Sequence, residues 1–204
     1  MSNPPSRTRT RTRTPHPLPA SGFSLVEVLV AAMVLIVAAA GVAQLLAVGL
    51  RATQSGRETT STGALASQKI EQLRSLTWTY DAAGAPHSDT YTDLSRDPPA
   101  PGGRGLDLSP PGTLDRDVAG YVDYLDARGR WIGAGPDPPT GAIFVRRWAV
   151  QTLDDDPQDS RVLIVRAAVV TEDRAAIGAG VPRRQLPRDT VLVSLETRQR
   201  GVSW

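Results

Sequence analysis

The chain has 204 residues, with 23 Lys or Arg against 21 Asp or Glu and a formal net charge of +2. It contains no cysteine, which excludes disulfides, thiol nucleophiles and cysteine-bound zinc. Only two histidines are present and no phosphate-binding or dinucleotide-binding glycine pattern follows a strand, so we expect a protein that is not an enzyme and needs no cofactor. A hydrolase that works with carboxylates alone is the remaining enzymatic alternative.

Residues 1–22 form a basic leader in which five prolines disfavour regular structure. Four arginines alternate with threonines, without any acidic residue: Arg7, Arg9, Arg11 and Arg13. By the positive-inside rule, such a leader stays in the cytoplasm while the following chain crosses the membrane. A nucleic-acid-binding arm is the alternative. Without these arginines 19 basic residues stand against 21 acidic ones, so we expect no specific nucleic-acid partner for the rest of the chain.

Residues 23–50 are the predicted membrane segment. As a helix they would extend about 42 Å, whereas the hydrocarbon core of a bilayer needs only about 20 apolar residues. Glu27 is the only charged residue in the segment, Gln44 is the first strongly polar residue after it, and Arg51 is the first positive charge. The length and the lack of a polar face disfavour the alternative of a buried helix in a soluble protein.

An ordinary secretory signal peptide is a closer alternative, because small residues at 38–40 or 42–43 could be cleavage sites. Two features disfavour it. Glu27 lies inside the apolar block, where a disposable signal gains nothing from a carboxylate, and the block is longer than a usual signal core. The lack of cysteine excludes a lipoprotein, and no adjacent arginine pair supports a twin-arginine signal.

Residues 22–27, with the sequence GFSLVE, resemble the cleavage and methylation motif of type IV prepilins and type II secretion pseudopilins. That motif has a glycine before the cut, Phe or Met after it, and Glu four residues later. The resemblance covers roughly residues 7–49. It implies cleavage between Gly22 and Phe23 by a membrane prepilin peptidase, and N-methylation of Phe23 by the same enzyme. It also implies other pilin or pseudopilin subunits and an inner-membrane assembly platform as partners, besides the lipid bilayer.

The position of Glu27 has a physical interpretation of its own. After cleavage, Phe23 would carry a new ammonium group one helical turn from Glu27. Charges in apolar surroundings have to be paired, so in a bundle of such helices Glu27 would pair with the Phe23 amine of a neighbouring subunit. Because apolar packing has little axial preference, this pair would set the axial offset between subunits. A Glu27 that only reaches the lipid headgroups is the alternative.

Many major pilins carry a proline about twenty residues past the cut, but residues 41–45 contain none, which favours a minor component or a pseudopilin. The lack of cysteine also excludes the disulfide-closed loop of many major pilins. The sequence therefore predicts a minor pilin of a type IV pilus, anchored once in the inner membrane with a periplasmic C-terminal domain. A type II secretion or DNA-uptake pseudopilin is the alternative within the family. A single-pass anchored or secreted binding domain is the alternative from another class.

Residues 51–77 are predicted to continue the helix beyond the membrane. An apolar stripe runs along its second half and comprises Leu65, Ala66, Ile70, Leu73, Leu76 and Thr77. Three polar residues lie mostly off that stripe: Gln68, Lys69 and Gln72. An amphipathic helix of this kind packs its apolar face on a sheet.

Residues 78–204 are predicted to form a β-rich domain large enough for one core, with a Pro/Gly-rich loop at 81–116. Strand patterns follow at 120–125, 131–132, 142–153, 161–171 and 189–198. In the third pattern Phe144, Arg146, Trp148 and Val150 alternate with Val145, Arg147 and Ala149, and in the last one Val191, Val193 and Leu195 share a face. We expect a pilin-like α+β fold in which the inner face of an antiparallel sheet receives the helix stripe.

Four carboxylates lie close together between two of these strand patterns: Asp154, Asp155, Asp156 and Asp159. Oxygen ligands of this kind could hold calcium, as some pseudopilins do. The run lacks the spacing of a known calcium loop, so a solvated acidic hairpin turn is the favoured interpretation and no metal is assigned.

Overall fold

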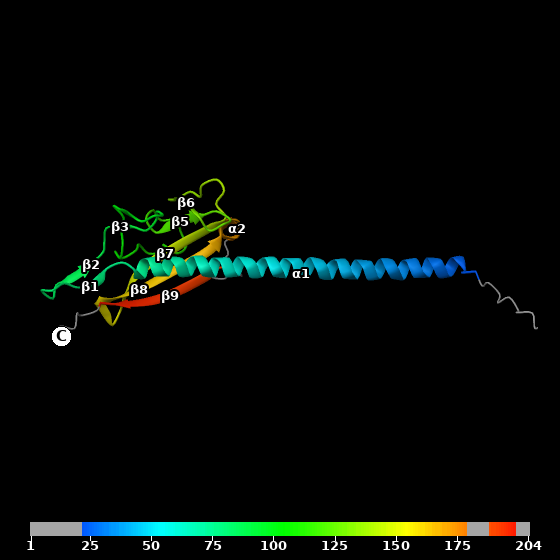
Figure 1. Ribbon diagram of the computed structural model, residues 1–204, viewed down its shortest axis with the longest axis horizontal. Coiled ribbons are helices and arrows are strands. Elements are labelled where there is room, and N and C mark those ends of the chain that lie inside the picture. The colour runs from blue at the N-terminus through cyan, green and yellow to red at the C-terminus, as the bar shows by residue number, and fades with distance from the viewer. Residues whose placement is uncertain (1–21, 179–187, 199–204) are drawn as a thin grey trace, which may run out of the picture. The chain divides into compact units, whose positions relative to one another are not determined.

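The computed structural model describes residues 22–178 and 188–198, so the arginines of the predicted leader lie outside the described residues. The chain divides into two compact units, Met1–Gly49 and Leu50–Trp204. Helix α1 (Leu25–Arg74) is continuous through both (Figure 1). It confirms the expected long N-terminal helix, although it ends at Arg74 rather than at Thr77.

The helix start is capped by Ser24. The backbone N–H of Val26 donates to Ser24 Oγ at 3.3 Å, and the N–H groups of Glu27 and Val28 donate to the Ser24 carbonyl at 3.0 and 3.1 Å. A serine at this position satisfies N–H groups that have no partner inside the helix. Glu27 therefore occupies the first turn, where a carboxylate is favoured by the helix dipole.

The larger unit contains a five-stranded antiparallel sheet with the strand order β6-β5-β7-β8-β9. The strands are β5 (Val122–Leu125), β6 (Trp131–Ala134), β7 (Phe144–Leu153), β8 (Asp156–Val169) and β9 (Thr190–Thr197). All five expected strands are present, and the expected α+β arrangement of a long helix with an antiparallel sheet is confirmed.

Both boundaries of the fourth expected strand were predicted wrongly. Strand β8 begins at Asp156 rather than at Arg161, inside the acidic run that was expected to be a turn. The apolar run that begins at Arg161 was expected to stay extended to Thr171, but β8 ends at Val169 and helix α2 (Val170–Gly178) begins at once. The β-branched residues Val169, Val170 and Thr171 favour a strand by composition. Glu172 and Asp173 nevertheless stand in the first turn of a helix, where acidic residues are favourable.

The predicted loop at 81–116 contains short ladders. Strand β1 (Trp78–Tyr80) pairs with β2 (Pro86–Ser88), and β3 (Thr92–Asp93) pairs with β4 (Ala100–Pro101). The first hairpin is fastened to the sheet by Trp78, whose ring lies 3.7 Å from the Arg198 guanidinium and whose Nε1 donates to the Asp159 carbonyl at 3.1 Å. Proline and glycine are disfavoured in strands, so these short strands were not recognised in the sequence.

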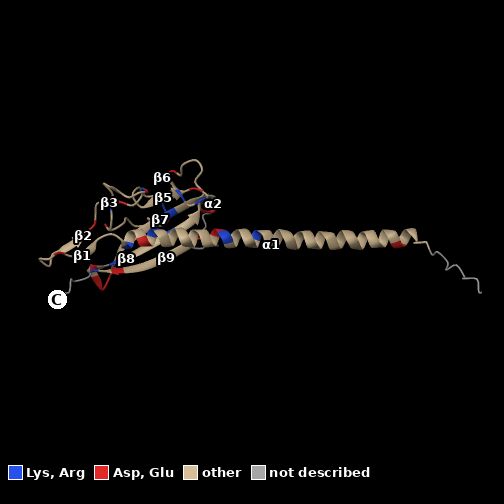
Figure 2. Ribbon diagram, viewed as in Figure 1, with Lys and Arg blue, Asp and Glu red and all other residues tan. Residues whose placement is uncertain are grey.

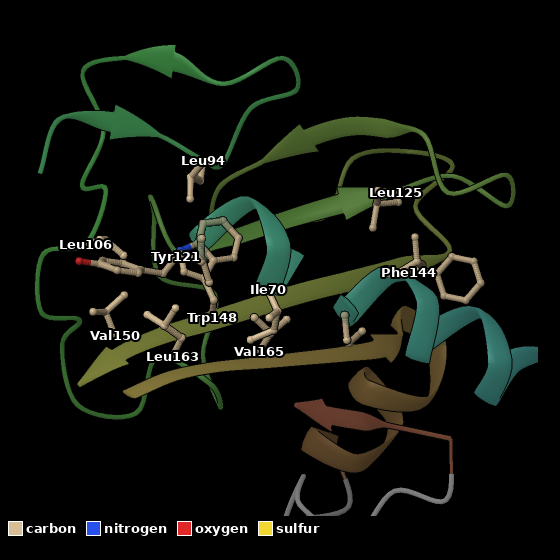
Figure 3. Packing of buried hydrophobic residues seen from close by; sticks show 14 of the residues in the cluster. Ile70, Leu94, Leu106, Tyr121, Leu125, Phe144, Trp148, Val150, Leu163 and Val165 are labelled. Carbon is tan, nitrogen blue, oxygen red and sulfur yellow. The ribbon is translucent and has the colours of Figure 1, made fainter. Parts of the chain in front are cut away.

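The main core lies between α1 and one face of the sheet, as expected from the helix stripe. Figure 3 shows Ile70 of α1 above Trp148 and Val165 of the sheet. Thr77, which we assigned to the stripe, is exposed because the helix has already ended. The buried members of this core on α1 are Leu65, Ala66, Ile70 and Leu73, and those on the sheet include Leu125, Phe144, Trp148, Val150, Leu163, Val165, Ala167 and Val169.

A second, smaller core lies on the opposite face of the sheet. It consists of Val122, Tyr124, Val145, Ala168 and Val170, with Ile132 and Ala142 packed against it. In residues 142–153, alternate side chains therefore belong to two different buried cores. Both faces of the central strands are covered.

Candidate functional site

The predicted processing residues lie directly before the capped helix. Gly22 and Phe23 are outside regular secondary structure, and the Phe23 side chain is 83 % exposed. Ser24 separates them from the first helical turn. The Gly22–Phe23 peptide bond is therefore accessible, and it is not locked into helical hydrogen bonds.

Glu27 is exposed, and its carboxylate forms no hydrogen bond or ion pair with any residue between 22 and 178 or between 188 and 198. No lysine or arginine lies between Glu27 and Arg51, so the helix itself offers no cation within reach. Figure 2 shows one acidic residue near the start of an otherwise uncharged stretch of α1. Within the described part of the chain, the carboxylate thus has no partner and lies on the apolar first half of α1.

Ser24 is a residue that our sequence analysis missed. Ser24 and Glu27 have the spacing of a capping box, in which a serine before the helix is followed three residues later by a glutamate. That signal was readable from the sequence. The structure forms a serine cap, but Ser24 Oγ accepts from the N–H of Val26 rather than from that of Glu27, which a capping box would use.

Helix α1 contains the single segment among the described residues that is long and apolar enough to cross a membrane. None of that segment is buried, and its side chains include many of the most exposed aliphatic residues of the chain, such as Leu35, Val37 and Leu45. By length and composition it could serve as a membrane anchor or as a secretion signal.

The acidic run between β7 and β8 makes the turn between these two paired strands. Asp154 and Asp155 are exposed in that turn, whereas Asp156 and Asp159 belong to β8. Asp156 accepts a hydrogen bond from Ser160 at 2.7 Å, and Asp159 lies 3.4 Å from Arg198 Nε. Within the part of the chain that the structure describes, no three His, Cys, Asp or Glu residues are grouped so that they could hold a metal ion.

A buried charge cluster joins α1 to the sheet, and its lysine was predicted wrongly. We placed Lys69 mostly off the apolar stripe, but it is fully buried. Its Nζ lies 2.8 Å from Asp123 Oδ2, donates to the Leu94 carbonyl at 2.7 Å, and stands 4.4 Å from the Trp148 ring centre. Burial lowers the pKa of Lys69 from 10.5 to about 8, although the nearby Asp123 carboxylate opposes that shift.

Asp123 is shared between two cations. Arg146 binds it with two parallel hydrogen bonds, from Nε at 2.8 Å and Nη2 at 2.7 Å, and its Nη1 donates to Gln68 Oε1 at 3.0 Å. Asp123 and Arg146 are direct partners in the β5–β7 ladder. Because a carboxylate buried without a partner is costly, this arrangement fixes the rotation of α1 on the sheet.

A second buried charge cluster lies on the other face of the sheet. Arg147 binds Asp173 of α2 at 2.8 Å and Asp117 at 2.6 Å, while Arg166 pairs with Asp189. Burial raises the pKa of Asp189, with the Arg166 guanidinium acting in the opposite direction. Each carboxylate in this cluster faces a guanidinium, so the cluster joins α2 and the start of β9 to the sheet.

Comparisons of this chain with protein-family models, with curated proteins and with solved structures gave no match in any of the three.

Proposed function

We propose that this chain is a minor pilin, a structural subunit of a type IV pilus or a related filament. In this proposal a prepilin peptidase cuts between Gly22 and Phe23 and methylates the new amino terminus. The first half of α1 anchors the subunit in the inner membrane, with the basic leader in the cytoplasm and the sheet in the periplasm. It then packs against the same segment of neighbouring subunits in the filament.

The observation that carries the proposal is the exposed Glu27 carboxylate, which has no partner among the described residues and lies on an otherwise uncharged first half of α1. A carboxylate inside a membrane-spanning segment costs about 2.5–3.5 kcal/mol at the helix centre and less towards its end, so its presence calls for a partner. Peptide-bond cleavage before Phe23 would create an ammonium group one turn away. A plain anchor or a secretion signal has no use for this carboxylate.

The remaining features of the helix fit the same proposal. The exposed Gly22–Phe23 bond stands before the Ser24 cap, so a protease would not have to unwind α1 to reach it. The exposed aliphatic residues of 25–49 need either lipid or other helices around them. A type II secretion or DNA-uptake pseudopilin shares all of these features and remains the alternative within the class.

The proposal is tested by the mass of the full chain extracted from membranes of a host with an active prepilin peptidase. We expect a chain that begins at N-methylated Phe23, and a chain of full length in a strain without that peptidase. Intact mass spectrometry measures both. A chain that keeps residues 1–22 in the peptidase-containing host contradicts the proposal, and a start near 41–44 supports a secreted domain instead.

A further inference from the structure

The middle of helix α1 is built from residues that form helices poorly. Eight of the thirteen residues from 51 to 63 are Thr, Ser or Gly, all of which have a lower helix propensity than alanine. The helix is stronger on both sides of this part. Residues 25–49 are largely apolar, and residues 64–74 consist mainly of good helix formers and pack on the sheet. The weakest part of α1 therefore lies between its apolar half and its packed half.

Three hydroxyl groups in this part add hydrogen bonds that compete with those of the helix. Thr59, Thr60 and Ser61 each donate from the side chain to the carbonyl four residues earlier, at 3.0, 2.9 and 2.9 Å. Side-chain bonds of this kind slightly destabilise a helix and often bend it. Gly56 adds backbone freedom. A Cβ at Gly56 would meet open space, so close packing against the described residues does not explain a glycine there.

This part of the helix also lacks the protection that its neighbours have. From Arg51 to Arg57 every residue is exposed except Ser55, which is partly exposed. Helical hydrogen bonds open most readily where water reaches them and few apolar contacts hold them. In the proposed function, lipid or other helices surround residues 25–49, and from Thr62 onwards the sheet covers one face of the helix.

A bridge of ion pairs marks the point at which α1 becomes attached to the larger unit. Arg188 Nη1 lies 2.5 Å from Glu58 Oε2 and 2.7 Å from Glu172 Oε1, so it joins α1 to α2. One turn later, Thr62 Oγ1 donates to the Arg188 carbonyl at 3.1 Å. The three charged side chains are 22–27 % exposed, and ion pairs in contact with water stabilise a structure only weakly. The bridge can therefore break while the core beneath it stays packed.

We propose that residues 51–61 form a hinge, which lets the larger unit change its angle to the apolar half of α1. This inference rests on the membrane anchoring in the proposed function but not on processing at Gly22. Opening of one or two helical turns changes the direction of the chain. Residues before the hinge keep their apolar surroundings, and the core around Ile70 stays intact. The larger unit can then adopt several angles to the membrane without unfolding.

Hydrogen exchange of the full chain in lipid nanodiscs measures the opening. We expect the amides of residues 51–61 to exchange at least about tenfold faster than those of residues 64–74. The alanine variant combines Gly56→Ala, Thr59→Ala and Thr60→Ala. It should slow exchange in residues 51–61 by about tenfold, because alanine is the best helix former and two of the competing side-chain bonds are removed.

Gly41→Ala is the matched control for the glycine substitution. Like Gly56, Gly41 has open space where a Cβ would stand, but it lies in the apolar half of α1. It should leave the exchange of residues 51–61 unchanged. Equal exchange rates of residues 51–61 and 64–74 in the wild type would overturn the proposal, as would a Gly41→Ala effect as large as that of the alanine variant.

Distances between spin labels test the change of angle, and the absence of cysteine makes labelling direct. Leu46→Cys with Tyr91→Cys places the two labels on opposite sides of the hinge, whereas Val193→Cys with Tyr91→Cys places both in the larger unit. The three side chains are 64, 68 and 65 % exposed. In nanodiscs we expect a broader distance distribution for the first pair, which narrows in the alanine variant. Equal widths for both pairs, or a width that the alanine variant leaves unchanged, would overturn the hinge.

The mass of the N-terminus is measured on the same samples, purified from a host with prepilin peptidase. A correctly processed chain with a rigid segment at 51–61 counts against the hinge alone. An unprocessed chain in which this segment opens counts against the proposed filament function alone.

Discussion

At the scale of single residues, this chain places its charges in two opposite environments. Glu27 is an exposed carboxylate without a partner among the described residues, whereas Lys69 is buried and contacts Asp123 and the Leu94 carbonyl. Inside a membrane, the first arrangement would call for a partner, which we propose to be the Phe23 amine of a neighbouring subunit. The second is complete within the fold, and its consequences are therefore measurable on the isolated protein.

Replacing the residue before the proposed cut should block processing. We expect Gly22→Ala to leave residues 1–22 attached in a host with prepilin peptidase, because the added methyl group occupies the position next to the scissile bond. The intact mass of the membrane-extracted chain shows it. The matched control is Gly41→Ala, which has open space around its Cα on the exposed helix and should be processed normally.

The lowered pKa of Lys69 predicts an unusual dependence of stability on pH. The folded chain holds the Lys69 proton less tightly than the unfolded chain, so it binds fewer protons between about pH 8 and the model-compound value of 10.5. The contribution of Lys69 to the free energy of unfolding therefore rises with pH across this window, by roughly 3 kcal/mol at about 1.4 kcal/mol per pKa unit. Below pH 8 that contribution is constant.

Denaturant unfolding of the wild type and of Lys69→Met at several pH values measures this effect. Methionine keeps the length of the side chain and leaves Asp123 paired with Arg146. We expect the stability difference, wild type minus variant, to increase from pH 8 to 10.5. A flat difference would show that Lys69 titrates as an ordinary exposed lysine, and a decrease would show that folding raises its pKa.

At the scale of elements, α1 has two parts with different surroundings. Residues 25–49 expose aliphatic side chains along their entire length. From Thr62 onwards, by contrast, one face of the helix packs on the sheet. The second part is fixed by the apolar stripe and by the contacts of Lys69 and Arg146. Both parts belong to one continuous helix. A contact between subunits through residues 25–49 would therefore be made by a helix whose later residues are packed on the sheet.

Truncating the stripe should destabilise the larger unit, while the same change in the first part of α1 should not. Leu73 is completely buried and Leu45 is 74 % exposed. We expect Leu73→Ala to lower the free energy of unfolding by about 2–5 kcal/mol through lost burial and a cavity, and Leu45→Ala to change it by less than about 0.5 kcal/mol. Denaturant unfolding in detergent, followed by tryptophan fluorescence, measures both, and equal effects would contradict the assignment of the core.

At the scale of the whole molecule, the two units would have different roles in the proposed filament. The first unit would supply the assembly surface, and the second would present its sheet and loops. Among the described residues, the buried charges of the second unit pair within that unit, whereas Glu27 of the first unit has no partner and its aliphatic residues are exposed. These aliphatic residues need lipid or other helices around them.

Removing the Glu27 carboxylate should separate processing from assembly. We expect Glu27→Ala and Glu27→Gln to be cleaved after Gly22 but to enter filaments at least about tenfold less than wild type, because an unpaired ammonium would remain in apolar surroundings. Mass spectrometry reports cleavage, and the amount of subunit in sheared filaments reports assembly. Leu29→Ala is the control, since loss of apolar contact alone should have a smaller effect. Wild-type assembly of Glu27→Gln would refute the pairing.

Much of this architecture can be predicted from the sequence, because it depends on local periodicity. The uncharged run after Glu27, the stripe of Ile70 and Leu73, and the alternation around Trp148 each predicted an element that the structure contains. Helix α2 was not predicted, because the residues from Val169 to Thr171 favour a strand by composition.

The tertiary structure alone decided which charges are buried and which apolar residues are not. Lys69 looked like a solvent-facing lysine, and its burial depends on Asp123 and Arg146, which are brought to it by strands far along the chain. Val193 was expected only to share a face with Val191 and Leu195, and the exposure of that face follows from β9 being at the edge of the sheet with α1 on the other face. Periodicity is a property of neighbours in the chain and can be read from the sequence. Burial and charge pairing depend on neighbours in space, which only the fold brings together.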